Sequence, residues 1–144
     1  MLTNKIKDDF KNLLSKEGLK LTKSRLSILE DILSSEEHRE CEEIHSALLA
    51  KKIKVSRATV YRTLDFLVKY EYIRKLDIGD GRIRYEKKLG TAHHDHMICI
   101  ETGDIIEFHN EEIENIQDEI AKRNGYKIIR HVHQLFVKPL KKTK

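Results

Sequence analysis

The chain has 144 residues, of which 28 are Lys or Arg and 24 are Asp or Glu, and its formal charge is +4. This length allows one larger domain or two small ones, and a hydrophobic share of 39% suffices to bury a core. Two cysteines without a CxxC pair exclude a disulfide scaffold, and no secretory signal or membrane-spanning run is visible. We therefore expect a cytoplasmic protein with no membrane partner.

Residues 1–87 carry 19 basic and 15 acidic side chains and predict helices followed by a β-hairpin. Thr22 and Ser56 are suited to cap two of the helices, and Gly79-Asp80-Gly81 is a turn signal between two alternating segments. This order predicts a winged helix-turn-helix; a small helical bundle with a solvated charged face is the alternative. The predicted helices span 5–17, 23–34, 40–51 and 57–70, and the predicted hairpin strands span 72–78 and 82–86.

The helix at 57–70 carries a surface suited to the DNA major groove. At 100° per residue, Ala58 and Arg62 lie opposite the apolar stripe, and Tyr61 lies on its flank. A small residue permits close approach, an Arg reaches phosphates or base edges, and an aromatic ring contacts a thymine methyl group. The apolar stripe consists of Val60, Leu64, Leu67 and Val68.

Residues 88–144 hold nine basic and nine acidic side chains and six of the eight histidines. After a hinge at 87–92 they predict a β-β-α-β unit, with Asn110 as the helix cap. So small a unit leaves a sheet face or edge exposed, and we expect a second copy to cover it in a homodimer. The strands are predicted at 95–100, 105–108 and 126–137, and the helix at 111–123 with Ile113, Ile116 and Ile120 toward the core.

The run His93-His94-Asp95-His96 contains four side chains that can bind a metal. Successive side chains of a β-strand point to opposite faces, so His94 and His96 would share one face and His93 and Asp95 the other. One strand could then serve two metal sites, and imidazole with carboxylate suits zinc, iron or manganese. A solvated polar turn is the alternative.

Three motifs occur in order along the chain. They are Gly18-Leu19-Lys20-Leu21-Thr22 with Arg25-Leu26-Ser27-Ile28-Leu29, then Ala58-Thr59-Val60-Tyr61-Arg62-Thr63-Leu64, and then the histidine run with Gly103-Asp104-Ile105-Ile106-Glu107-Phe108. With these gaps the chain resembles the ferric uptake regulator (Fur) family from about residue 18 to 138. The resemblance implies an α+β protein that acts as a metal-responsive, DNA-binding transcriptional repressor. It has an N-terminal winged helix-turn-helix DNA-binding domain at 1–86, a hinge at 87–92 and a C-terminal α/β metal-binding dimerisation domain at 93–144.

The family's regulatory metal site joins the two domains, and the resemblance implies a competent residue at each ligand position here. A second site, found in many relatives, is implied on the opposite face of the histidine strand. The regulatory ligands would be His38, Glu86, His94, His96 and Glu107, and the second-site ligands His93, Asp95, Glu114 and His131.

The four-cysteine structural zinc site of many members cannot form in this chain. Cys99 is present, but Thr102 stands at its partner position and the C-terminal tail has no cysteine. Peroxide-sensing relatives use Asp where Glu86 and Glu107 stand, and zinc-sensing relatives bring a cysteine into the regulatory site. The resemblance therefore favours Fe(II) as the effector, with Mn(II) or Zn(II) as alternatives and Zn(II) in one of the two sites.

The expected partner is double-stranded operator DNA, bound by a homodimer or a higher oligomer.

Two other classes of protein could use metal-binding side chains of this kind. A metalloenzyme would use Glu86 or Glu107 as general base, but the sequence supplies no apolar substrate pocket, so we expect no enzyme. A metal-storage module would not need the basic half.

The resemblance implies DNA contacts from Lys20, Arg25, Arg57, Tyr61 and Arg62, of which Arg25 and Arg57 could also be plain surface charges.

Overall fold

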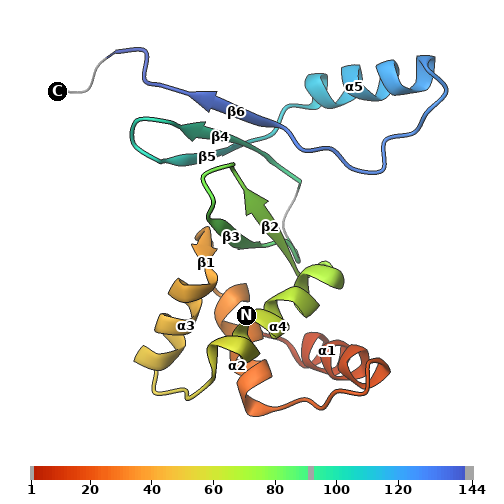
Figure 1. The fold of residues 1–144 in the computed structure, drawn as a ribbon. Helices are drawn as coiled ribbons and strands as arrows, with labels where there is room; N and C mark the ends of the chain where they lie inside the picture. The colour runs from red at the N-terminus through yellow and green to blue at the C-terminus, as the bar shows by residue number, and fades with distance from the viewer. Residues whose placement is uncertain (1, 91–92, 142–144) are drawn as a thin grey trace. The chain divides into compact units, whose positions relative to one another are not determined.

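The computed structural model describes residues 2–90 and 93–141, and the chain divides into two compact units, residues 1–91 and 92–144 (Figure 1). Unit 1 is mainly helical, and unit 2 is built on a small sheet. The elements of unit 1 are α1 (Asn4–Lys16), α2 (Lys23–Leu33), β1 (Arg39–Glu40), α3 (Cys41–Ala50), α4 (Arg57–Lys69), β2 (Ile73–Asp77) and β3 (Ile83–Lys87). Those of unit 2 are β4 (Asp95–Cys99), β5 (Ile105–Phe108), α5 (Glu111–Arg123) and β6 (Gln134–Val137).

Two helices of unit 1 begin at the caps that the sequence predicts. The Thr22 hydroxyl accepts the backbone N–H of Arg25 at 3.1 Å, and the Ser56 hydroxyl accepts that of Thr59 at 3.1 Å. Each hydroxyl satisfies a donor that the first turn of a helix leaves without an internal partner. The starts of α2 and α4 are therefore set by local sequence, as predicted.

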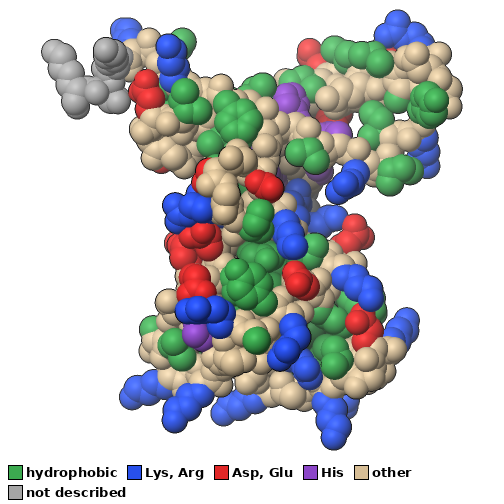
Figure 2. All heavy atoms as spheres, viewed as in Figure 1, with side chains coloured by type: hydrophobic (Ala, Val, Ile, Leu, Met, Phe, Trp, Pro, Cys, Tyr) green, Lys and Arg blue, Asp and Glu red, His purple; other side chains and the backbone are tan. Residues whose placement is uncertain are grey.

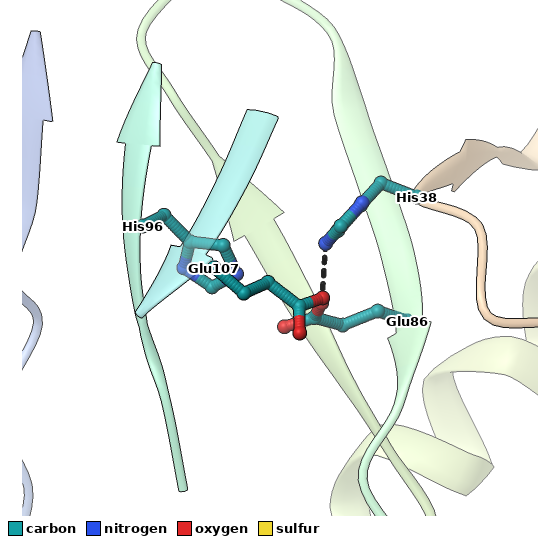
Figure 3. Close-up of side chains that lie close together, drawn as sticks. All are labelled: His38, Glu86, His96 and Glu107. Atoms are coloured by element: carbon teal, nitrogen blue, oxygen red, sulfur yellow. Dashed lines mark ion pairs between the residues drawn. The ribbon is translucent and has the colours of Figure 1, made fainter. Parts of the chain in front are cut away.

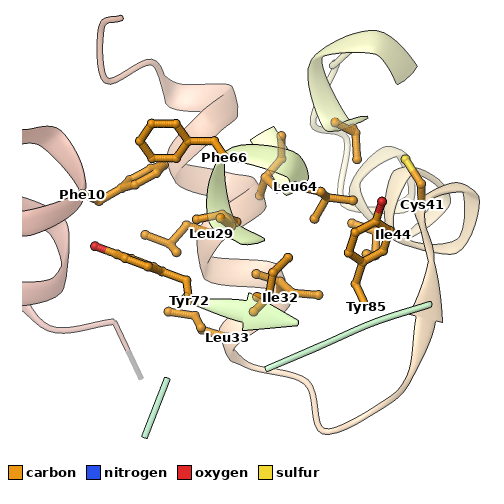
Figure 4. Close-up of a cluster of buried hydrophobic side chains, with 14 of the residues drawn as sticks. Phe10, Leu29, Ile32, Leu33, Cys41, Ile44, Leu64, Phe66, Tyr72 and Tyr85 are labelled. Carbon is orange, nitrogen blue, oxygen red and sulfur yellow. The ribbon is translucent and has the colours of Figure 1, made fainter. Parts of the chain in front are cut away.

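The core of unit 1 gathers side chains from its four helices and its sheet (Figure 4). Phe10 of α1 packs edge-on against Phe66 of α4, with ring centroids 5.8 Å apart, and Leu29 and Leu64 are fully buried. Burial of one such side chain contributes about 1.5–3 kcal/mol. With the β2–β3 hairpin beside these helices, the predicted winged helix-turn-helix is confirmed.

The sheet of unit 1 has the order β1-β3-β2, and both pairings are antiparallel. Gly79 and Gly81 close the hairpin with φ angles of +84° and +80°, which glycine adopts without steric cost. Strand β1 was not predicted, because two residues show no alternation. Its pairing of Arg39 with Tyr85 brings the segment before α3 onto the hairpin.

A buried ion pair ties β1 to α2. The Arg39 guanidinium donates to Asp31 Oδ2 at 2.7 Å, and these residues are only 8% and 5% exposed. Lys51, whose side chain is half exposed, contacts Asp31 Oδ1 at 3.0 Å. Since a buried carboxylate is costly without a partner, the guanidinium of Arg39 offsets the burial of Asp31 inside the unit.

The sheet of unit 2 has the order β5-β4-β6, with β5 antiparallel and β6 parallel to the central strand. Helix α5 begins at the predicted cap, where Asn110 Oδ1 accepts the Ile113 N–H at 3.1 Å. The expected strand at 126–137 is wrong over most of its length, because β6 pairs with β4 only through Gln134–Val137.

The expectation that one side of α5 packs into the core is also wrong for a single chain. No described side chain of α5 is buried, and Ile116 and Ile120 are 56% and 47% exposed. The isoleucines are correctly placed on one face of the helix, but the described residues of this chain do not cover that face.

The predicted hinge begins within ordered structure. Lys87 is the last residue of β3, and the N–H groups of Lys88 and Leu89 both donate to the Tyr72 carbonyl at 3.0 Å. Residues 91 and 92 lie outside the described residues. Among the described helices, none has the length and apolar character needed to cross a bilayer.

The Asp31–Arg39 pair leads to a stability prediction. Arg39→Met should lower the free energy of unfolding by about 3 kcal/mol, because it leaves a buried carboxylate without its guanidinium partner. Urea denaturation measures the loss. Lys51→Ala removes an exposed cation from the same carboxylate and should cost less than about 1 kcal/mol. Equal losses in the two variants would contradict the assignment of Arg39 as the main partner of Asp31.

Candidate metal centres and nucleic-acid interface

In unit 1, His38 and Glu86 form an imidazole–carboxylate pair. Nε2 of His38 lies 2.6 Å from Oε2 of Glu86, as the dashed line in Figure 3 marks. The β1–β3 register explains this contact: Arg39 faces Tyr85, so the residue before Arg39 lies beside the residue after Tyr85. Arg74, opposite Glu86 on β2, contacts its other oxygen at 3.5 Å. We call this the His38–Glu86 pair.

Unit 2 gathers His94, His96 and Glu107 around β4 and β5. The rings of His94 and His96 lie 5.0 Å apart between centroids, and His94 Nε2 is 3.6 Å from Glu107 Oε1. His96 and Glu107 are register partners on neighbouring strands, and Figure 3 labels both. His94 precedes β4 rather than belonging to it, but it keeps the predicted alternation and shares a face with His96. We call these three residues the His94–His96–Glu107 group.

The other face of the histidine run brings together a four-residue cluster. Asp95 Oδ1 is 2.8 Å from His131 Nε2 and 3.4 Å from His93 Nε2. Glu114 of α5 reaches both imidazoles, at 3.2 Å from His93 Nε2 and 3.3 Å from His131 Nδ1. We call His93, Asp95, Glu114 and His131 the second cluster.

The second cluster has the composition of a zinc or iron site. Each of its residues offers one ligand atom, and these four atoms all lie within 4.8 Å of one another. Ligands about 2 Å from a shared ion would be separated by roughly 3–4 Å, so small side-chain movements suffice to bind one. Two imidazole nitrogens and two carboxylate oxygens also balance the charge of a divalent cation.

One residue beside this cluster was missed from the sequence. His133 Nδ1 lies 3.8 Å from Asp95 Oδ2, and its ring packs edge-on against Phe108. The spacing of His131 and His133 was the available signal, because residues two apart share a face in extended chain.

The two cysteines lie in different units and in different environments. Burial raises the pKa of the Cys41 thiol to about 11. A hydrogen bond from the Thr102 hydroxyl and backbone N–H donors lower the pKa of Cys99. Two cysteines cannot supply the four thiolates of a tetrathiolate zinc site, so Cys99 is left as a single thiol at the end of β4.

The face of α4 that we predict to contact DNA is exposed to solvent. Ala58, Arg62 and nearly half of Tyr61 are exposed, and the opposite stripe is buried at Val60, Leu64 and Leu67, with Val68 half-buried. Figure 2 shows Lys and Arg side chains gathered around the helical end of unit 1. An exposed, positively charged helix face of this kind can contact a DNA backbone.

Of the remaining candidate DNA residues, Arg57 is the first residue of α4, Arg25 belongs to α2 and Lys20 precedes α2. Arg25 Nη1 donates to the Lys20 carbonyl at 2.6 Å, which joins the loop before α2 to that helix. Arg25 and Arg62 also line one cavity of about 100 Å³. Arg57 is paired at 2.6 Å with Glu42, and since both side chains are more than half exposed this contact is easily exchanged.

A winged helix with an exposed basic recognition helix, linked to a unit rich in metal-binding side chains, defines a metal-responsive transcriptional regulator. The sequence profile of the ferric uptake regulator family matches residues 16–136. The ferric uptake regulation protein of Brucella abortus is 36% identical over 135 residues, covering 94% of this chain and 95% of that protein. The chain therefore belongs to the ferric uptake regulator family.

Solved structures agree with this assignment. The Helicobacter pylori ferric uptake regulator matches with a TM-score of 0.86 at 35% identity, covering 97% of this chain and 93% of that one. The Pseudomonas aeruginosa ferric uptake regulator with manganese matches with a TM-score of 0.77 at 35% identity, covering 89% and 96%. The predicted α+β fold with its two parts is thereby confirmed.

The thiol environments predict an order of chemical labelling. At pH 8, iodoacetamide should modify Cys99 before Cys41, because the thiolate is the reactive form and only Cys99 has a lowered pKa. Peptide mass spectrometry over time measures both sites in one sample. Faster labelling of Cys41 in the folded protein would contradict the environments described.

Proposed function

We propose that this protein is an iron-dependent repressor, which binds operator DNA when Fe(II) is bound and so controls iron-uptake genes in the cytoplasm. Relatives named ferric uptake regulation proteins support this, at 36–38% identity over most of the chain. Glu, not Asp, stands at positions 86 and 107, and Cys41 and Cys99 lie outside the candidate ligands, which favours iron over peroxide or zinc sensing. The Pseudomonas relative was solved with manganese, so Mn(II) is the main competing effector.

The regulatory site in this proposal combines the donors of both units. The His38–Glu86 pair supplies one imidazole and one carboxylate, and the His94–His96–Glu107 group supplies two imidazoles and one carboxylate. Such a mixed set suits Fe(II), Mn(II) or Zn(II). The proposed domains are 1–86 and 93–144, joined by a hinge at 87–92, so one ion bound by both would restrict their arrangement.

The second cluster is proposed as a structural zinc site. Helix α5 has no buried side chain among the described residues, and the extended segment before β6 lacks strand partners. Glu114 and His131 come from these two segments, Asp95 is the first residue of the central strand, and His93 lies two residues before it. An ion at this cluster would tie all three together, in a chain that cannot form a tetrathiolate zinc site. The Helicobacter relative has three functional metal-binding sites, which supports more than one site per chain.

A second copy of the chain is proposed to cover the apolar surface of unit 2. Eight large apolar residues of β5, α5, β6 and the segment between the last two are between 41% and 89% exposed. A stable small unit rarely leaves so much apolar surface to water, and a symmetric dimer would bury it. These residues are Ile106, Ile116, Ile120, Tyr126, Ile129, Val132, Leu135 and Phe136.

In the proposed dimer, the two α4 helices enter successive major grooves of the operator. Tyr61 and Arg62 would contact bases and phosphates, with Arg57 near the helix start and Lys20 and Arg25 beside it. Metal binds only the arrangement in which both donor sets meet, so it shifts the population toward that arrangement by its differential affinity. Such coupling typically changes DNA affinity by about 5–150-fold.

The metal dependence is tested by operator binding of the full chain with and without Fe(II), Mn(II) and Zn(II). We expect at least a roughly tenfold gain in affinity with the effector, and loss of that gain in His38→Ala. His109→Ala, which changes an exposed histidine outside both donor sets, should respond like the unmodified chain. Equal affinity with and without every metal would defeat the proposal.

The role of α4 is tested by the salt dependence of operator binding. If Arg62 contacts one phosphate, Arg62→Ala should lower the slope of log K against log salt by about 0.9. Lys69→Ala is the matched control, because Lys69 lies on the same helix but is paired with Glu17 at 2.9 Å. An unchanged slope in Arg62→Ala would exclude the phosphate contact.

A further inference from the structure

His133 occupies a defined place beside the second cluster. The parallel register of β4 and β6 pairs His96 with Gln134, so the preceding residues Asp95 and His133 lie side by side. The His133 carbonyl accepts the His96 N–H at 3.2 Å, which fixes its backbone. On the other side of Asp95, its register partner Phe108 packs edge-on against the His133 ring at 5.6 Å. The backbone of His133 is therefore fixed by β4, and its ring is fixed by Phe108.

The two oxygens of the Asp95 carboxylate have different neighbours. Oδ1 faces the second cluster, at 2.8 Å from His131 Nε2. Oδ2 points to Nδ1 of His133, at 3.8 Å. Asp95 is only 3% exposed, and Nδ1 of His133 is buried without a hydrogen-bond partner among the described residues. A buried imidazole nitrogen directed at a buried carboxylate oxygen is costly unless the two groups interact.

We propose that His133 is a positioning residue of the second metal site, donating its Nδ1–H to Oδ2 of Asp95 while Oδ1 binds the metal. This inference rests on the proposed function of the second cluster. Reaching a hydrogen-bond distance of about 2.9 Å requires a movement of roughly 1 Å. The bond occupies the distal oxygen, so Asp95 supplies one ligand atom rather than two.

A single ligand atom from Asp95 has a consequence for the choice of metal. With one atom from each of the four residues, the cluster offers four donors, which suits tetrahedral zinc. A carboxylate that bound through both oxygens would favour ions with higher coordination numbers. His133 thus contributes to zinc affinity without touching the ion.

The test uses two substitutions of His133 in the full-length protein. His133→Leu removes the donor, whereas His133→Asn keeps an N–H near the position of Nδ1. Zinc affinity is measured by competition with a chromophoric chelator, and the binding step lost in Asp95→Ala identifies the second site. We expect zinc binding to weaken about tenfold or more in His133→Leu and to recover to within about threefold in His133→Asn. His109→Leu, a change of an exposed histidine, should leave that step unchanged.

The possible outcomes of these measurements lead to different conclusions. If Asp95→Ala removes a zinc step but His133→Leu binds zinc as tightly as the unmodified chain, the inference is wrong and the second site stands. If Asp95→Ala removes no step, the proposed site itself fails. Cobalt(II) absorption separates positioning from ligation: a spectrum of His133→Leu that stays four-coordinate, or that moves to a higher coordination number because Oδ2 of Asp95 is freed, supports positioning, and a spectrum that shows the loss of a nitrogen ligand overturns it. Thermal unfolding of His133→Asn, expected to match the unmodified chain, shows whether the comparison is made between folded proteins.

Discussion

The alternation of side chains along β4 is the constraint on which the metal chemistry of this protein depends. Because successive residues point to opposite faces, a run of four donors is divided between two groups. His94 and His96 join Glu107 on one face, and His93 and Asp95 join Glu114 and His131 on the other. A shift of one residue in the pairing of β4 with β5 would exchange the faces and destroy both groups.

The apolar packing of unit 2 within one chain is slight. Its helix buries no described side chain, and the segment before β6 leaves Ile129 and Val132 89% and 76% exposed. Unit 1 is the opposite case, with a core of fully buried side chains from every helix. In the proposed function, the DNA-binding part has a core of its own, and metal and a second copy of the chain would supply the structure that the responsive part lacks.

Local signals in the sequence predicted much of this structure. Helix-capping residues, turn glycines and apolar periodicity predicted the helices and the hairpin. The alternation of side chains along a strand predicted that the histidines divide between two faces. The predictions that failed concern contacts between residues that are distant in sequence. Strand β1 exists because Tyr85 pairs with Arg39, and no strand among the described residues pairs with residues 126–132. The spacing of His131 and His133 shows only that the two can share a face, and the contact of His133 with Asp95 follows from the β4–β6 register.

The central claim is that one ion is held by donors from both units. A double-mutant cycle on metal affinity tests it most directly, using His38→Ala, His96→Ala and the pair together in the full chain. If both imidazoles bind the same ion, the second substitution should cost far less once the first has been made, giving a coupling energy above about 1 kcal/mol. Strictly additive losses would show that the two histidines serve separate sites, and the proposed link between metal and DNA binding would lose its physical basis.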